Sequence, residues 1–255
     1  MQKRMVTPGM LHDEHGHLNE TGYATELIKT YDRSRVAAKR WRIKEWDYYA
    51  VCSDRFALAL TIDHNGYMFM DSISLLDFEK NSQVTKSMMG LPFMSPRDLP
   101  PTSAKGNIRV KGKQYMISFE NDGHSRHLTG FMNQFSGQDT IVFDLHLTDA
   151  PKESMVIVTP YQDHPEAFYY NQKINCMKAD GIITVGQRNI PAVLRIHSLC
   201  WTGAGECGRM IIPGTGVPHP DWRTACPSDS ISVTALGTHL LQARMCCSMT
   251  EKSIS

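Results

Sequence analysis

The chain has 255 residues, with 27 Lys and Arg against 26 Asp and Glu, and it carries no polybasic block or acidic tail. This balance argues against a nucleic-acid partner, and no run approaches the roughly 18 consecutive apolar residues of a membrane-spanning helix. Lys3 and Arg4 are not followed by the apolar run of a secretory signal, so a cytoplasmic protein is expected. The length permits one large domain or two small ones.

Residues 1–40 are expected to form an extended lead-in followed by one helix. Asn19 or Thr21 can cap this helix, because both side chains can accept a hydrogen bond from a free backbone amide. Apolar residues then recur at helical spacing, namely Leu27, Ile28, Tyr31 and Val36.

From Arg42 onward the apolar residues alternate, which predicts strands. Phe56, Leu58 and Leu60 share one face of the first clear strand. Asn65-Gly66 separates two such runs, and this pair is favoured in a type I′ hairpin turn. Similar breaks occur at Gly112-Lys113, Asp122-Gly123 and Asp180-Gly181.

The breaks divide the rest of the chain into short strands at 108–111, 114–120, 126–132, 140–148 and 155–159. In 140–148 the apolar residues face one way and the polar ones the other, which predicts a sheet with one dry and one wet face. The segment 88–105 contains four prolines and cannot continue a central strand, so it is expected to be a long loop acting as a linker or a lid.

These patterns predict a mainly β protein. The antiparallel meander is expected to form a lipocalin-like barrel or a β-sandwich, and the pattern does not distinguish one barrel from two. We expect three parts: the lead-in and helix at 1–40, a β-rich domain at 41–191 with a sub-boundary at the loop 88–105, and an irregular, disordered tail at 192–255.

Several motifs resemble a bacterial family catalogued as domain of unknown function 2804, and the resemblance covers residues 7 to about 190. The motifs are Leu18–Tyr23, Tyr31–Arg33, Arg42–Tyr49, Phe119–Asn121, Thr159–Tyr161 and Ala167–Ile174. The resemblance implies no particular activity. In general shape the family is similar to lipocalin-like two-barrel proteins such as the carotenoid hydratase relatives, which implies a barrel that holds an apolar molecule.

The composition changes abruptly near residue 192. All nine Phe and all nine Tyr lie at or before Tyr170, whereas five of the seven Cys lie at or after Cys200. The family resemblance implies a later strand close to LDWGRGVW, which is absent from the written sequence. If the gene is read one base out of register, the codons of Cys200 and Trp201 can give only leucine, and those of Trp201 and Thr202 only aspartate. The codons up to Val217 also permit the remaining residues of this strand. We therefore hypothesise a frameshift at 190–193, which would truncate the in-frame domain and leave a sheet edge unpaired.

The cysteines do not predict a metal site or a cofactor. The late ones lack the paired C-x₂-C spacing of structural zinc, and the hypothesis of an out-of-frame segment accounts for them. Cys52 and Cys176 are too few for a disulfide framework. The histidines His124, His127, His146 and His164 are scattered, and solvated histidines are favoured over metal ligands.

The strongest candidate for chemistry lies in the run Arg42–Tyr49. On a strand, Glu45, Asp47 and Tyr49 share one face, and the two carboxylates lie about 7 Å apart, a spacing suited to general acid and base work. The competing interpretation is a salt-bridged network that braces the mouth of a barrel.

Weaker candidates come from two other places. Asp144 and His146 share the polar face of their strand and would line a lumen if that face turned inward; His146 is then a further candidate for proton transfer. An aromatic rim for a ligand is also possible in principle, although core packing is the usual fate of such residues. Its candidate members are Trp46, Tyr161, Tyr169, Tyr170 and Lys173.

Two functions of different class remain open. The first is a binding module that holds a small, largely apolar molecule, oriented by Glu45 and Asp47. The second is a hydratase or hydrolase that uses Glu45 and Asp47 as an acid/base pair, with Tyr49 or His146. A pocket lined only by apolar groups favours the first, and converging ionisable groups favour the second. The oligomeric state is not predicted.

Overall fold

The computed structural model describes residues 3–161, 164–191 and 194–207. The chain divides into two units, Met1–Gly208 and Arg209–Ser255, and every described residue lies in the first. The described residues form mainly strands, with three short 3-10 helices, η1 (Arg33–Arg35), η2 (Arg40–Arg42) and η3 (Pro92–Met94). Within these ranges, no helix has the length and apolar character needed to cross a membrane.

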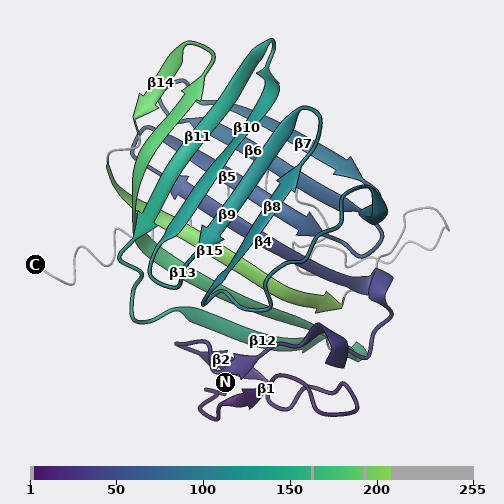
Figure 1. Cartoon of the computed structure of the whole chain (residues 1–255). Helices are drawn as coiled ribbons and strands as arrows, with labels where there is room; N and C mark the ends of the chain where they lie inside the picture. The colour runs from purple at the N-terminus through teal and green to yellow at the C-terminus, as the bar shows by residue number, and fades with distance from the viewer. Residues whose placement is uncertain (1–2, 162–163, 192–193, 208–255) are drawn as a thin grey trace, which may run out of the picture. The chain divides into compact units, whose positions relative to one another are not determined.

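The strands follow the chain in a simple order (Figure 1). They are β1 (Gly9–Met10), β2 (Gly22–Ala24), β3 (Lys29–Thr30), β4 (Ile43–Cys52), β5 (Phe56–His64), β6 (Phe69–Asp77), β7 (Ser82–Gly90), β8 (Gly106–Lys111), β9 (Tyr115–Asn121), β10 (Arg126–Ser136), β11 (Asp139–Thr148), β12 (Met155–Tyr161), β13 (His164–Val185), β14 (Arg188–Pro191) and β15 (Leu194–Cys207).

The strands of the main sheet run in the order β7-β6-β5-β4-β15-β13-β11-β10-β9-β8, and all of its neighbours are antiparallel. The sheet folds over itself, so that β8–β11 cross in front of β4–β7 (Figure 1). One hydrophobic core fills the space between these layers and includes Leu58 and Ile73 from one layer and Phe119 and Leu128 from the other. The mainly β, antiparallel prediction is confirmed, and the open order from β7 to β8 corresponds to a sandwich rather than a closed barrel.

The long strand β13 links the two layers. Its first part pairs with β12, and its last part pairs with β11 and β14. Between them the register with β15 shifts near Ile174 and Met177, and Cys176 has a φ of 64°. An irregularity of this kind bends a strand and increases its twist, which allows one strand to serve both layers.

The N-terminal segment packs against β12 and β13, and the helix predicted there is wrong. β2 pairs with β12, β3 pairs with β1, and only the short turn η1 is helical in this segment. Tyr31 and Val36 are buried in a second core together with Val158 and Phe168. The apolar spacing therefore arises from an extended chain lying on a sheet, where tertiary packing outweighs helical periodicity.

Most predicted hairpins are confirmed, but the turn at Asn65-Gly66 differs in type. Of these two residues only Gly66 has a positive φ, at 79°, whereas a type I′ turn requires it at both positions. The Asn65 amide donates to the Met68 carbonyl at 2.8 Å, so the loop between β5 and β6 is longer than two residues.

The break predicted at Asp180-Gly181 is wrong, because β13 continues through both residues. Gly181 has a φ of 138°, and a Cβ placed there would lie 2.1 Å from the Asp144 carbonyl oxygen on β11. This glycine marks a close approach of two backbones inside the sheet rather than a turn.

The expectation of an irregular segment from residue 192 is wrong for its first part. The backbone of Leu194–Cys207 forms β15, which lies between β13 and β4 in the sheet. The remainder of the predicted tail, 208–255, lies outside the described residues.

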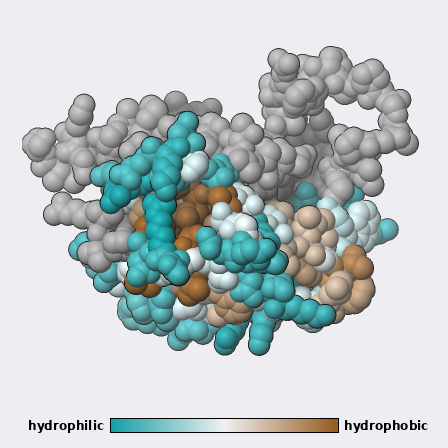
Figure 2. All heavy atoms as spheres, turned by 90° about the horizontal axis from the view of Figure 1, so that it is seen from above, coloured by the Kyte–Doolittle hydropathy of each residue, from teal (hydrophilic) through white to brown (hydrophobic). Residues whose placement is uncertain are grey.

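The outer face of β11 is largely polar and exposed, as the alternation in 140–148 predicts, whereas both faces of β5 are buried. On β11, Ile141, Phe143 and Leu145 are buried, whereas Asp144 and His146 are exposed. Seen from above, hydrophobic residues gather in one area that is bordered by hydrophilic ones (Figure 2). The sheet therefore has the dry and wet faces expected from its sequence.

Gly181→Ala should destabilise the fold, because the added methyl group meets the Asp144 carbonyl and the backbone conformation is strained as well. We expect a loss of about 2 to 4 kcal/mol in urea denaturation. Gly137→Ala is the control, since Gly137 has a φ of 63° and no heavy atom within 4 Å of an added Cβ. Equal losses in the two variants would contradict the steric explanation.

Candidate functional site

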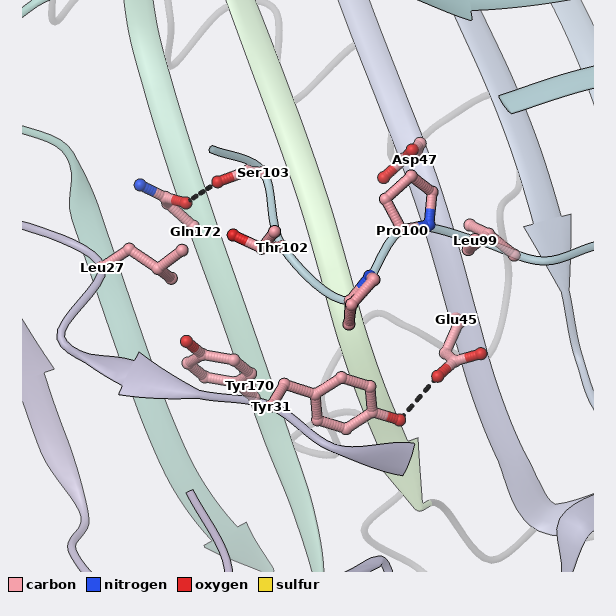
Figure 3. A pocket seen from close by; sticks show the side chains of 11 residues that line it. Leu27, Tyr31, Glu45, Asp47, Leu99, Pro100, Thr102, Ser103, Tyr170 and Gln172 are labelled. Carbon is pink, nitrogen blue, oxygen red and sulfur yellow. Dashed lines mark hydrogen bonds between the residues drawn. The ribbon is translucent and has the colours of Figure 1, made fainter. Parts of the chain in front are cut away.

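A pocket lies where β4, β13, the N-terminal segment and the loop between β7 and β8 meet (Figure 3). Its walls combine apolar side chains with two carboxyl groups. The lining residues are Leu27, Tyr31, Glu45, Asp47, Leu99, Pro100, Pro101, Thr102, Ser103, Tyr170 and Gln172.

Strand alternation on β4 turns Glu45, Asp47 and Tyr49 inward. All three are buried, whereas Lys44, Trp46 and Tyr48 on the opposite face are only partly buried. The predicted sharing of one face is confirmed. Glu45 and Asp47 line the pocket, but Tyr49 belongs to the main core. There its ring packs edge-to-face on the Phe119 ring, with the ring centroids 4.6 Å apart.

Glu45 is held by two donors from the N-terminal segment. The Tyr31 hydroxyl donates to Oε1 at 2.6 Å (Figure 3). Arg33 donates to Oε2 at 2.5 Å. Burial raises the pKa of Glu45, and these two hydrogen bonds partly oppose that effect because they favour the ionised form. Glu45 is thus a fixed, paired group.

Asp47 has a different environment. Its side chain is buried, and no hydrogen bond to its carboxyl group occurs among the described residues. Burial raises the pKa of Asp47 to about 7, against the attraction of Arg126 and with a further contribution from the charge of Glu45. The group therefore exchanges its proton near neutral pH while it faces the pocket.

The roof of the pocket is the proline-rich loop 91–105, which one buried arginine fixes to the sheet. Arg97 forms an ion pair with Asp71 on β6, and both side chains are completely inaccessible to solvent. Tyr115 also donates to Asp71, at 2.6 Å, and the Arg97 guanidinium lies 3.6 Å from the centre of the Phe69 ring. Two charges can be buried in this way because the ion pair and the hydrogen bonds compensate for their loss of contact with water.

The other end of the loop is fixed through Ser103. Its hydroxyl group is hydrogen-bonded to the side chain of Gln172 on β13. The Ser103 carbonyl accepts from Asn121 at 2.8 Å and from Arg126 at 3.1 Å. The segment between Arg97 and Ser103 therefore spans the pocket between two anchors.

The closed pocket is small. A volume of about 20 Å³ accepts the centre of a water molecule, which corresponds to about one water. The roof segment 99–103 is a part of the pocket wall that belongs to no strand, so its displacement would enlarge the pocket. Arg97 and Ser103 hold its two ends, and Leu99 packs against the main core.

Asp144 and His146 do not line a lumen, and this expectation is wrong. Their side chains are 58% and 60% accessible to solvent, on the outer face of β11. The face turns outward because the alternate residues Phe143, Leu145 and Leu147 fill the core between the layers. These two residues take no part in the pocket.

Of the candidates for an aromatic rim, Tyr170 lines the pocket and the others do not. Tyr170 lines the pocket and donates to the Lys29 carbonyl at 2.9 Å. Trp46 and Tyr169 lie near each other, with ring centroids 6.4 Å apart, but are not among the lining residues. Tyr161 packs against the second core, and Lys173 is partly buried on β13; neither lines the pocket.

Sequence reasoning missed several residues that form the site. Tyr31 and Arg33 occurred in a family-like motif, but nothing in the sequence linked them to Glu45. Ser103 and Gln172 form a contact across 69 positions of the chain, which no local pattern reveals. The proline-rich composition of 88–105 was the available signal for the roof.

Comparisons with known proteins give a family but no activity. A family profile described as "Domain of unknown function (DUF2804)" matches residues 2–194. No curated protein matches the chain. A crystal structure of a candidate AttH protein from Nitrosomonas europaea has 14% sequence identity and a TM-score of 0.44, covering 69% of this chain. The match spans 55% of that protein, and likeness at this level supports no argument about function.

Asp47→Asn should change how stability depends on pH. The pKa of Asp47 is about 7 in the folded chain and 3.8 ordinarily, so the folded state holds the proton more tightly. The contribution of the protonated Asp47 to the free energy of unfolding is complete below about pH 4 and is lost as the pH rises through 7. The variant should therefore gain stability over wild type across this range, by at most about 4 kcal/mol at pH 8.

Urea denaturation between pH 4 and pH 8 measures this difference. Asp122→Asn is the control, because hydrogen bonds from the Ser125 and His124 amides lower the pKa of that exposed carboxyl to about 2. It should give no gain at high pH. A constant difference between Asp47→Asn and wild type would contradict a raised pKa at Asp47.

Proposed function

This chain belongs to the family described as "Domain of unknown function (DUF2804)", and we propose that its pocket binds a small, largely apolar molecule that carries one polar group. The observation that supports the proposal is the buried carboxyl of Asp47, which faces the pocket without a hydrogen bond from the described residues. A ligand group that donates to or accepts from Asp47 would add a hydrogen bond in a site of low polarity.

The character of the walls supports the apolar part of the ligand. Leu27, Leu99, Pro100 and Pro101 present hydrocarbon surface, and the Tyr170 ring adds an aromatic wall. Apolar walls with a few placed polar groups are typical of small-molecule sites. Of the two carboxyl groups that line the pocket, Asp47 is the one without a hydrogen bond from the described residues, so it is the group we expect to orient the ligand.

The roof determines how the ligand enters. Thr102 and Ser103 lie over the same space as Asp47, and the closed pocket has room for about one water. We infer that binding displaces the segment 99–103 while Arg97 stays attached to Asp71. A loop with one permanent and one exchangeable anchor provides such a lid.

A second function is favoured by one observation, the contrast between the two carboxyl groups. Glu45 is fixed by Tyr31 and Arg33, whereas Asp47 has a pKa of about 7. A group that titrates near neutral pH can act as a general acid or base, and neighbouring carboxyls in unlike environments can take different roles. The alternative is therefore a hydratase or hydrolase in which Asp47 transfers the proton and Glu45 stays in place.

Native mass spectrometry of the purified chain tests the binding proposal. We expect wild type to retain a small molecule from its expression host, and Asp47→Asn to retain about tenfold less, because a hydrogen bond to a buried carboxyl group is lost. Asp122→Asn makes the same chemical change at an exposed turn and should retain as much as wild type. A chain that retains nothing, or an Asp47→Asn variant that retains the wild-type amount, would contradict the proposal.

The same experiment separates the two functions. The retained molecule is identified by liquid chromatography and mass spectrometry and then incubated with fresh protein in water. A binding module returns it unchanged. An enzyme converts it by addition of water or by hydrolysis, and Asp47→Asn should then lose conversion more than retention.

We also propose that the written sequence leaves the family's reading frame near residues 190–193. The family match ends at residue 194, within one residue of that interval. The backbone of β15 runs beside β4, with Thr202 opposite Asp47. In the corrected frame this strand would read close to LDWGRGVW, whose Trp and Val residues favour strands.

Sequencing the gene across codons 185–200 tests the frame proposal. The expected result is one missing base in this interval, relative to a frame that continues the family sequence. An open frame with no such discrepancy in the raw reads would overturn it. The described lining residues of the pocket all lie between 27 and 172, so the corrected frame would change the identity of none of them.

A further inference from the structure

We propose that His127, Asp144 and His146 form a binding site for a divalent transition metal, of the kind occupied by Zn²⁺, on the outer face of β10 and β11. The three side chains offer ligand atoms that all lie within 4.8 Å of one another. The site is independent of the pocket, and it revises the expectation that these histidines are merely solvated.

The antiparallel register brings the three residues together. His127 on β10 lies directly opposite His146 on β11, and Asp144 is two residues from His146 on the same face. The two imidazole rings are stacked, with centroids 4.1 Å apart and an angle of 8° between their planes. Both rings therefore point the same way and present their Nε2 atoms to one carboxylate.

The distances suit a tetrahedral metal. Zinc binds imidazole nitrogen and carboxylate oxygen at about 2.0 to 2.2 Å, which places neighbouring ligand atoms roughly 3.3 Å apart. The Asp144 Oδ1 atom lies 2.7 Å from His127 Nε2 and 3.7 Å from His146 Nε2. The observed spacings lie on either side of the required one, so small side-chain rotations are sufficient.

The strands that carry these ligands are held firmly from the other side. Leu128, next to His127, and Leu145, between Asp144 and His146, have no exposed surface and belong to the core between the layers. A site built on packed strands is better preorganised than one on a loop, so binding costs little conformational entropy.

Flanking acidic residues add to the attraction for a cation. Glu120 on β9 lies opposite His127, and Asp180 on β13 lies opposite His146, both exposed on this face. These four residues form a row across four neighbouring strands. The nearby Lys178 is paired with Asp149 at 2.6 Å, which partly offsets its charge. A fourth ligand position remains for water or a substrate atom.

The donor set indicates the class of metal. Two imidazoles and one carboxylate suit Zn²⁺ and its first-row neighbours, whereas Mg²⁺ and Ca²⁺ prefer oxygen ligands alone. His127 and Asp144 already form a hydrogen-bonded pair, and the stacked rings form an aromatic contact across the two strands. Binding one metal requires the imidazoles to turn so that both Nε2 atoms point at it.

Isothermal titration with ZnCl₂ and with MgCl₂, on the full chain, tests the proposal. We expect Zn²⁺ to bind and Mg²⁺ not to bind at this site. His127→Ala and His146→Ala should each abolish the binding of Zn²⁺ at this site or weaken it at least about tenfold. His124→Ala is the matched control, because His124 lies exposed in the neighbouring turn and outside the cluster; it should leave the affinity unchanged.

Because histidine and cysteine side chains in general can bind zinc, the imidazole NMR resonances of His127 and His146 are followed as well. Both should shift together on addition of Zn²⁺, and the shift of either should vanish when the other is replaced. Zinc that perturbs only other histidines, or an affinity equal in wild type and His146→Ala, would overturn the proposal. The three replaced side chains are exposed or partly exposed, so the variants should fold.

Discussion

The buried ion pair between Arg97 and Asp71 determines the structure of the pocket. Neither side chain is accessible to solvent, and Tyr115 and Phe69 complete the surroundings of the two charges. Removing one partner of such a pair typically costs about 3 to 5 kcal/mol, because the other charge stays buried. The pair therefore holds the loop 91–105 over β4. The loop and Asp47 line the same pocket, and burial is the main cause of the raised pKa of that carboxyl.

The local features of the fold were predictable from the sequence, because alternation and turn residues act over short distances. Strands such as 140–148 were placed correctly, since burying Ile141, Phe143 and Leu145 fixes the orientation of every neighbouring residue. The failures have physical causes. The N-terminal apolar spacing matched a helix, but contacts with β12 and β13 hold that segment extended. Gly181 looked like a turn residue, although it serves the close approach of β13 to β11.

The candidate site was predictable only in part. The face shared by Glu45 and Asp47 follows from strand periodicity and was correct. Their different environments depend on partners distant in sequence, since Tyr31 and Arg33 reach Glu45 whereas no described residue bonds to Asp47. The outward direction of His146 follows from the alternation on β11, whereas a lumen for it would require a closed barrel, which the strand order does not form. The pairing of His127 with His146 likewise required the register of two strands.

A direct titration of the Asp47 carboxyl group tests the central claim, that the roof and β4 bury a proton-exchanging group in the pocket. The carboxyl carbon can be followed by carbon-13 NMR from pH 4 to pH 9, with Asp47→Asn used to assign its signal. The structure predicts a midpoint near pH 7. A midpoint near the ordinary aspartate value of 3.8 would show that the group is solvated, and both the binding proposal and its enzymatic alternative would then lose their basis.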